Sequence, residues 1–245
     1  MNHSAWPYPR MIAHRGAGKL APENTLGAFK LGYSHGYRMF ECDVKLSADG
    51  VAYLMHDATV DRTTNNTGDA SMLRWAALSQ LDAGSWHSAA YAGEPLPTLS
   101  HIAAFVRNHD CAINLEIKPI LGAEAHTGEV VATLAAALWQ GACVQPLISS
   151  FSEVALAAAQ KAQPQLLRAL LVDNIPADWQ ARLARLDCVA LDVNCKHLSD
   201  AWIDQIQSSG YRLLCYTCND PAQAAHFLRR GLDGVITDCV DTIPA

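Results

Sequence analysis

The chain has 245 residues, of which half are hydrophobic and 17% are charged, and its formal net charge is −6. This composition is typical of a globular protein with a sizeable core and excludes wholesale disorder. The negative charge excludes the basic surface of a nucleic-acid-binding protein and a polybasic patch for membrane surfaces. An anionic ligand would therefore have to be attracted locally, by a few placed cations or by a metal ion.

The chain begins without a basic stretch followed by an apolar one, so no secretory signal is predicted. No apolar run approaches the ~18 residues that a membrane span needs. The eight cysteines are scattered through apolar segments and are interpreted as reduced core residues, which favours a cytoplasmic location. Cys215 and Cys218 have C-x-x-C spacing, but no second pair stands nearby and a zinc site is not expected. The sequence leaves the oligomeric state open, a homo-oligomer included.

Eight short β-rich segments alternate with longer helical patterns, and the later ones are spaced roughly 20 residues apart, as in a compact strand–helix repeat. The predicted strands are 11–14, 39–46, 112–118, 146–151, 167–172, 188–194, 212–218 and 233–238. Eight strands with helices after at least seven predict an α/β fold of the (β/α)8 TIM-barrel type. An open doubly wound sheet is the alternative, but the loop after the first strand lacks a Gly-rich nucleotide fingerprint.

One connection is much longer than the others. Residues 47–97, between the second and third predicted strands, indicate a small insertion over one end of the barrel, within a single domain that covers residues 1–245. Long connections that follow a barrel strand usually carry functional residues.

Polar side chains gather where the predicted strands end, which is where the active sites of barrel enzymes lie. The side chains concerned are His14, Arg15, Glu41, Asp43, Glu116 and Lys118, together with His56 in the insertion. Residues two apart on a strand share a face, so Glu41 lies beside Asp43. The sequence thus predicts several charged groups at one end of the barrel interior.

Three of these side chains are carboxylates. Burying Glu41, Asp43 and Glu116 side by side is costly unless a cation lies among them. An all-oxygen site suits one divalent cation, Mg²⁺ or Ca²⁺. The alternative interpretation is a solvated face of an antiparallel strand, which conflicts with strands that are apolar on both faces.

The histidines and the remaining cations fit a phosphate ester. A single histidine at a strand end usually caps or packs, but His14 and His56 at the rim of one site favour acid/base chemistry. Arg15 and Lys118 would then be left to bind a phosphate.

Several motifs together resemble the glycerophosphodiester phosphodiesterase family. They are "AHRG…APENT", "ECDVKLSADG…LMHD", "LEIKP", "SSF", "YTCND" and "GVITD", in this order from about residue 7 to 241. Within the family the chain is most similar to bacterial cytoplasmic members. The resemblance implies a metal-dependent barrel hydrolase that splits glycerophosphodiesters, which are small-molecule substrates, into sn-glycerol 3-phosphate and an alcohol.

The resemblance also implies a role for each matching residue. These are His14 and His56 as the acid/base pair, Glu41, Asp43 and Glu116 as metal ligands, Arg15 and Lys118 as phosphate contacts, and Tyr216 as an aromatic lining of the substrate pocket. Glu23 and Asn24 either belong to the site or only supply the acidic first turn and N-cap of the helix that follows them.

The mechanism that these roles suggest has two steps. One histidine removes the proton of the glycerol 2-hydroxyl and the other protonates the departing alcohol, so that a cyclic phosphate forms and is then opened by water. Three alternatives remain: a related barrel phospholipase that acts on sphingomyelin or lysolipids, a metal-dependent lyase or aldolase, and a non-catalytic module that binds phosphodiesters.

Overall fold

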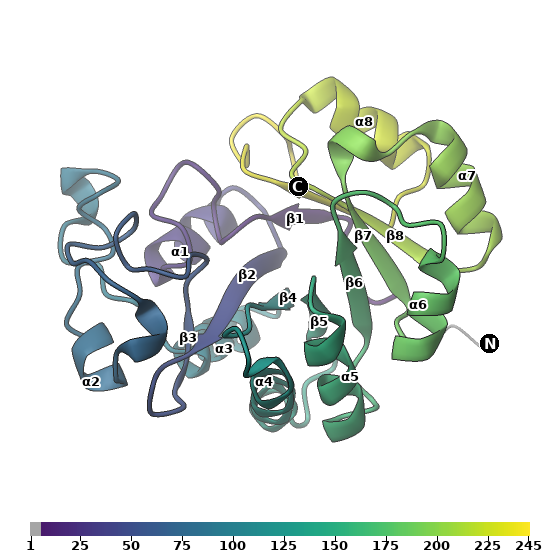
Figure 1. The fold of residues 1–245 in the computed structure, drawn as a ribbon. Helices are drawn as coiled ribbons and strands as arrows, with labels where there is room; N and C mark the ends of the chain where they lie inside the picture. Colours follow the sequence, from purple (N-terminus) through teal and green to yellow (C-terminus); the bar gives the residue numbers. More distant parts are fainter. Residues whose placement is uncertain (1–5) are drawn as a thin grey trace.

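A computed structural model describes residues 6–245, and in it eight parallel strands form a closed barrel. The strands are β1 (Met11–Ala13), β2 (Met39–Leu46), β4 (Ala112–Ile117), β5 (Leu147–Ser150), β6 (Arg168–Val172), β7 (Ala190–Asn194), β8 (Arg212–Tyr216) and β9 (Gly234–Thr237). The barrel closes because β1 pairs with both β2 and β9. The predicted TIM barrel is therefore confirmed (Figure 1).

A helix follows each barrel strand except β9, as the sequence predicted. These helices are α1 (Leu26–Ser34), α3 (Leu99–Asn108), α4 (Glu124–Leu138), α5 (Glu153–Ala162), α6 (Trp179–Leu186), α7 (Asp200–Ser208) and α8 (Pro221–Arg229). Most begin at a side chain that caps a free backbone N–H, such as Asp220 at the start of α8. In the part of the chain that the structure describes, no helix is both long and apolar enough to cross a bilayer.

The barrel interior consists of layers, because alternate residues of each strand point inward. The layer at the N-terminal end is apolar and is covered by Tyr8. Its residues are Ile12, Met39, Ala112, Leu147, Ala169, Ala190, Leu214 and Ile236. The outward residues of β2 and β4, such as Phe40 and Leu115, belong to the core beneath the helices, as predicted. Polar residues therefore reach the interior only in the layers nearer the C-terminal ends of the strands.

The insertion between β2 and α3 contains a strand that the sequence analysis did not assign. This strand, β3 (Ala52–Leu54), pairs antiparallel with the end of β2, so the barrel sheet gains a ninth strand. Two 3-10 turns, η1 (Ala70–Met72) and η2 (Ala89–Tyr91), and the short helix α2 (Trp75–Leu78) complete the segment. It has its own apolar cluster and lies beside β2 and α1, at the left of Figure 1. The pairing of β3 with β2 fixes the position of the residues that follow β3, which include His56.

Helix α1 packs closely on the loop that follows β1. A Cβ atom at Gly32, in the middle of the helix, would lie only 2.1 Å from the carbonyl oxygen of Gly16. The loop is also turned tightly, since the backbone N–H of Gly18 donates to the carbonyl of His14 at 2.8 Å. The absence of a side chain at Gly32 therefore sets the position of the loop that carries His14 and Arg15.

We expect Gly32→Ala to destabilise the protein by about 1–3 kcal/mol, the usual cost of an overpacked contact, although alanine favours a helix. Gly27→Ala in the same helix is the control, because its Cβ would meet only flexible side-chain ends, at 3.3 Å. Thermal unfolding followed by circular dichroism measures both. A Gly32→Ala variant as stable as Gly27→Ala would contradict this account of the loop.

Candidate active site

Three carboxyl groups meet inside the C-terminal end of the barrel. Glu41 and Asp43 come from β2 and Glu116 from β4, and the strand register places Asp43 directly beside Glu116. All three are buried, with one oxygen of each within 4.8 Å of the others. Within residues 6–245, Glu41 Oε1 has no hydrogen-bond partner. A cluster of hard oxygen ligands with a free, buried lone pair fits a divalent cation.

The protons of this cluster are distributed unevenly. Burial raises the pKa of Glu41 well above its usual range, and the neighbouring charges of Asp43 and Glu116 raise it further. Burial, together with Asp43, raises the pKa of Glu116 to about 7. Burial alone would also raise the pKa of Asp43, but Arg15 and Lys118 outweigh it and hold this pKa below its usual range. In the metal-free protein, Asp43 carries the negative charge most firmly.

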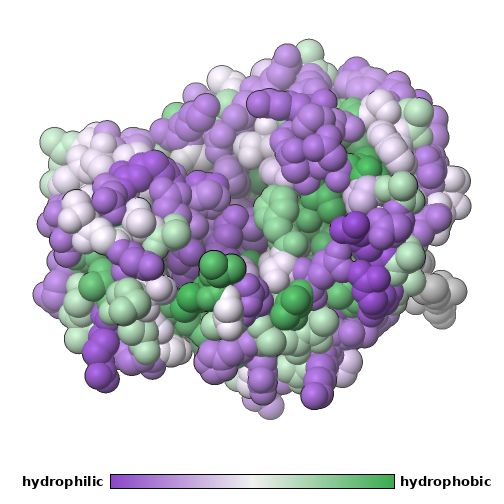
Figure 2. Space-filling model, viewed as in Figure 1, coloured by the Kyte–Doolittle hydropathy of each residue, from purple (hydrophilic) through white to green (hydrophobic). Residues whose placement is uncertain are grey.

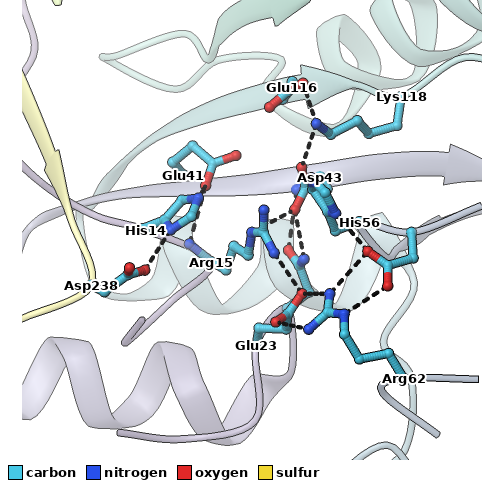
Figure 3. Close-up of polar contacts among 12 residues, drawn as sticks. His14, Arg15, Glu23, Glu41, Asp43, His56, Arg62, Glu116, Lys118 and Asp238 are labelled. Atoms are coloured by element: carbon cyan, nitrogen blue, oxygen red, sulfur yellow. Dashed lines mark hydrogen bonds and ion pairs between the residues drawn. The ribbon is translucent and has the colours of Figure 1, made fainter. Parts of the chain in front are cut away.

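Two cations lie against the carboxyl cluster (Figure 3). Arg15 Nε is 3.2 Å from Asp43 Oδ2. Lys118 Nζ lies 2.5 Å from Glu116 Oε1 and 3.3 Å from Asp43 Oδ1. Arg15 has a left-handed backbone (φ 49°), and its N–H donates to Glu41 Oε2 at 3.1 Å. The predicted phosphate contacts are thus beside the predicted metal ligands.

Each predicted acid/base histidine is paired with a carboxylate through Nδ1. His14 Nδ1 is 2.6 Å from Asp238 Oδ1, and His56 Nδ1 is 2.7 Å from Asp57 Oδ1. A carboxylate at Nδ1 favours the tautomer with a proton there and leaves Nε2 for a ligand. Burial lowers the pKa of His56, which favours a neutral ring that can accept a proton. Neither Asp57 nor Asp238 was identified from the sequence as a partner of a histidine, although Asp57 directly follows His56 and Asp238 ends the last predicted strand.

Glu23 and Asn24 belong to the site, and the interpretation as a cap of α1 is wrong. Thr25 is the residue that caps this helix, through its side-chain oxygen. Glu23 receives hydrogen bonds from Arg15 Nη1 at 2.7 Å and from Arg62. Arg62 also donates a hydrogen bond to Asp57, so a continuous chain of contacts joins Arg15 to the carboxylate that pairs with His56.

Asn24 holds Asp43 in position from both sides of its amide group. Its Nδ2 donates to Asp43 Oδ2 at 2.8 Å, and its Oδ1 accepts from the Asp43 backbone N–H at 3.1 Å. Asn24 is buried and has a left-handed backbone (φ 60°), a conformation that asparagine tolerates better than most residues. The motif "PENT" was the signal in the sequence, but it could not distinguish a cap from this contact.

A cavity of about 200 Å³ joins these groups. Its lining includes His14, His56, Arg15, Glu41, Glu116, Lys118 and Tyr216, together with Asn114, Phe151, Leu171, Asp192, Thr217 and Ile236. The predicted pocket aromatic, Tyr216, packs edge-on against Phe151 and donates its hydroxyl to the Val172 carbonyl. On the face drawn in Figure 2, hydrophilic and hydrophobic residues meet around a hollow in the middle of the molecule.

A larger cavity, of about 450 Å³, lies at the opposite end of the barrel, where the strands begin. Its two arginines are already bound to backbone carbonyls, Arg38 to those of Tyr33 and Tyr37 and Arg107 to that of Leu138. Because barrel active sites lie at the other end, this larger cavity is not the candidate site.

Comparisons with known proteins agree with this geometry. The model of the glycerophosphoryl diester phosphodiesterase family matches residues 14–242. A glycerophosphodiester phosphodiesterase of Caldanaerobacter subterraneus is 31% identical over 234 residues, which cover 95% of each chain. The structure of an Oleispira antarctica phosphodiesterase in complex with the product sn-glycerol-3-phosphate has a TM-score of 0.91 and 35% identity, with 96% of this chain and 95% of that chain covered. A glycerophosphodiester phosphodiesterase of Agrobacterium tumefaciens has a TM-score of 0.81 and 28% identity, covering 95% and 97%. The chain therefore belongs to the glycerophosphoryl diester phosphodiesterase family and is an enzyme of this class.

Proposed function

We propose that the protein hydrolyses glycerophosphodiesters to sn-glycerol 3-phosphate and an alcohol, with a divalent cation and two histidines. One observation carries the proposal. Two histidines that are each paired with a carboxylate, two cations, and Glu41 and Glu116 of the buried carboxyl cluster line a single small cavity. The Oleispira antarctica phosphodiesterase, whose fold matches this one with a TM-score of 0.91, was solved in complex with the product sn-glycerol-3-phosphate. This complex supports the same product for the present protein.

Glu41, Asp43 and Glu116 are the residues that would hold the cation, and their oxygen ligands fit Mg²⁺ or Ca²⁺. Such an ion, when bound, supplies positive charge that neutralises charge on the phosphate in the transition state. A divalent cation at this place would also explain why carboxyl groups that raise one another's pKa lie together inside the barrel. Asn24 keeps Asp43 oriented for this role.

The other residues of the site bind the phosphate and move protons. Arg15 and Lys118, which lie against the carboxyl cluster, are placed to bind the non-bridging phosphate oxygens. Nε2 of one histidine removes the proton of the glycerol 2-hydroxyl, whose oxygen attacks phosphorus. Nε2 of the other histidine gives a proton to the alcohol oxygen as its bond to phosphorus breaks. Water then opens the cyclic phosphate with the two roles exchanged.

The alternatives have less support. A cavity of about 200 Å³ is below the roughly 300–1,000 Å³ of sites that enclose drug-sized ligands, which favours a small glycerophosphodiester over a lipid substrate. A module that only binds phosphodiesters has no use for two histidines that are each oriented by a carboxylate. The pocket role of Tyr216, the cytoplasmic location and a homo-oligomeric state stay predictions.

Divalent cations should stabilise the protein, and more strongly at higher pH. Below pH about 7 the proton on Glu116 competes with the cation, whereas above it the carboxylate is free. Without metal, this raised pKa implies stability that is present at low pH and is lost as the pH rises through about 7. We expect the rise in Tm on adding Mg²⁺ or Ca²⁺ to be larger at pH 8 than at pH 6 and to be reversed by EDTA.

Glu116→Gln is the matched variant for this measurement, because it keeps the size of the side chain and removes the titrating group. It should lose most of the metal-dependent rise in Tm at both pH values. An equal rise in Tm for the variant and the wild type would exclude Glu116 as a ligand.

His14→Ala and His56→Ala should each lower kcat by about 10²–10⁴, the usual contribution of one acid/base group. The rise in Tm with divalent cation should stay close to that of the wild type, since neither histidine is assigned as a ligand. His101→Ala, an exposed residue of α3, is the control and should leave kcat unchanged. A loss of metal-dependent stabilisation in either site variant would overturn this division of roles.

The activity itself is tested with glycerophosphocholine as substrate. We expect release of sn-glycerol 3-phosphate that EDTA abolishes and added divalent cation restores, with little release from lysophosphatidylcholine. A diester whose glycerol 2-hydroxyl is replaced by hydrogen should turn over orders of magnitude more slowly, because intramolecular attack contributes about 7–11 kcal/mol to catalysis. Comparable turnover of this 2-deoxy compound would indicate direct attack by water.

A further inference from the structure

Two polar residues that line the cavity are not used by the proposed mechanism. Asn114 on β4 and Asp192 on β7 both line the cavity, and their side chains are almost completely buried, at 1% and 0% exposure. Asn114 lies two residues before Glu116 on the same strand and pairs in register with Glu41. Asn114 is therefore one inward-facing position deeper in the barrel than Glu116, level with Glu41, while Asp192 lines the same cavity from β7.

The polar atoms of both side chains are unpaired. Within residues 6–245, neither Nδ2 nor Oδ1 of Asn114 and neither carboxyl oxygen of Asp192 has a hydrogen-bond partner. Leaving a buried polar group unpaired costs about 1–3 kcal/mol, so two such side chains that line one cavity, from β4 and from β7, are a considerable cost to the fold. An unpaired buried group calls for a physical explanation, and in a ligand cavity a partner atom on the ligand supplies one.

The chemistry of the wall restricts what that partner is. The amide of Asn114 offers both a donor and an acceptor, so a ligand group that both donates and accepts is needed. A hydroxyl meets this requirement, whereas an ammonium group only donates. Burial raises the pKa of Asp192 well above its usual range, and the charge of Glu116 adds to the effect. A protonated Asp192 also both donates and accepts, which again favours an uncharged hydroxyl.

We propose that Asn114 and Asp192 bind the terminal hydroxyl of the glycerol moiety and so make the enzyme selective for glycerol over a propanediol. This inference rests on the proposed function, in which the glycerol 2-hydroxyl attacks phosphorus and the terminal hydroxyl is left for recognition. The position of Asn114, deeper on β4 than Glu116, places glycerol inward and the alcohol that leaves toward the mouth of the cavity. Selectivity then lies in the glycerol half of the substrate.

The test compares sn-glycerol 3-phosphate with the analogue in which the terminal hydroxyl is replaced by hydrogen, propane-1,2-diol 1-phosphate. The analogue keeps the phosphate and the 2-hydroxyl. Calorimetric titration of the metal-loaded wild type should show binding of the glycerol compound about 10- to 100-fold tighter, as expected when a ligand leaves buried polar groups unpaired. The corresponding phosphocholine diesters should differ in kcat/KM in the same direction.

Two variants at position 192 test whether Asp192 is responsible for the preference for sn-glycerol 3-phosphate over the analogue. Asp192→Leu removes the polar group and should bind both phosphates with similar affinity, while its Tm without ligand rises because an unpaired buried carboxyl is gone. Asp192→Asn keeps a donor and an acceptor and should retain most of the preference. Ser149→Ala is the matched control, since Ser149 Oγ is also buried and unpaired in the described chain but is not part of the cavity lining, and it should leave the preference unchanged.

The outcomes separate the two proposals. Equal binding of both phosphates by the wild type overturns the inference even if Asp192→Leu does not fold. An unchanged preference in Asp192→Leu also overturns it and makes Asp192 a group that is satisfied by water. In both cases glycerophosphocholine is still hydrolysed, whereas failure of the proposed function would appear as no hydrolysis of either diester by the wild type.

Discussion

The burial of three carboxyl groups beside one another is the constraint on which the rest of the site depends. The charge of Asp43 raises the pKa of both Glu41 and Glu116, because like charges that are buried together repel. Such a cluster needs compensating positive charge to be stable. Arg15 and Lys118 compensate Asp43, and a divalent cation, for which the three carboxyl groups fit, would compensate the remainder. The same arrangement makes a strongly polarising environment for a phosphate, so the feature that costs stability is the one that serves chemistry.

The barrel accommodates this cluster because the polar and apolar residues of its interior lie in separate layers. The two-residue alternation of each strand places an apolar layer at the N-terminal end of the interior and carboxyl and amide groups nearer the C-terminal end. The outward face of β2, which includes Cys42, is apolar and packs beneath the helices. Stability and function therefore use different ends of the same strands, which is why substitutions in one layer need not disturb the other.

Loops complete the site by holding groups that no strand could bring in. The loop after β1 carries His14 and Arg15 and is fixed by its contact with α1, while β3 aligns the insertion so that His56 reaches the cavity. The contacts of Glu23 with Arg15 and Arg62 join the two loops. The loops that carry the two histidines are thus held by contacts between segments that are distant in sequence.

The sequence by itself determined the barrel, seven of its helices and the group of charged residues at the strand ends, because alternation, caps and strand-end positions are local signals. Asn114, two residues before Glu116, was not identified from the sequence, because an unpaired amide cannot be recognised before its surroundings are known. Only the tertiary structure decided that Asn24 orients Asp43, that Asp238 and Asp57 pair with the histidines, and that Asp192 faces the cavity. These are contacts across the barrel or between loops, where closure of the sheet, and not the order of residues along the chain, sets which side chains meet.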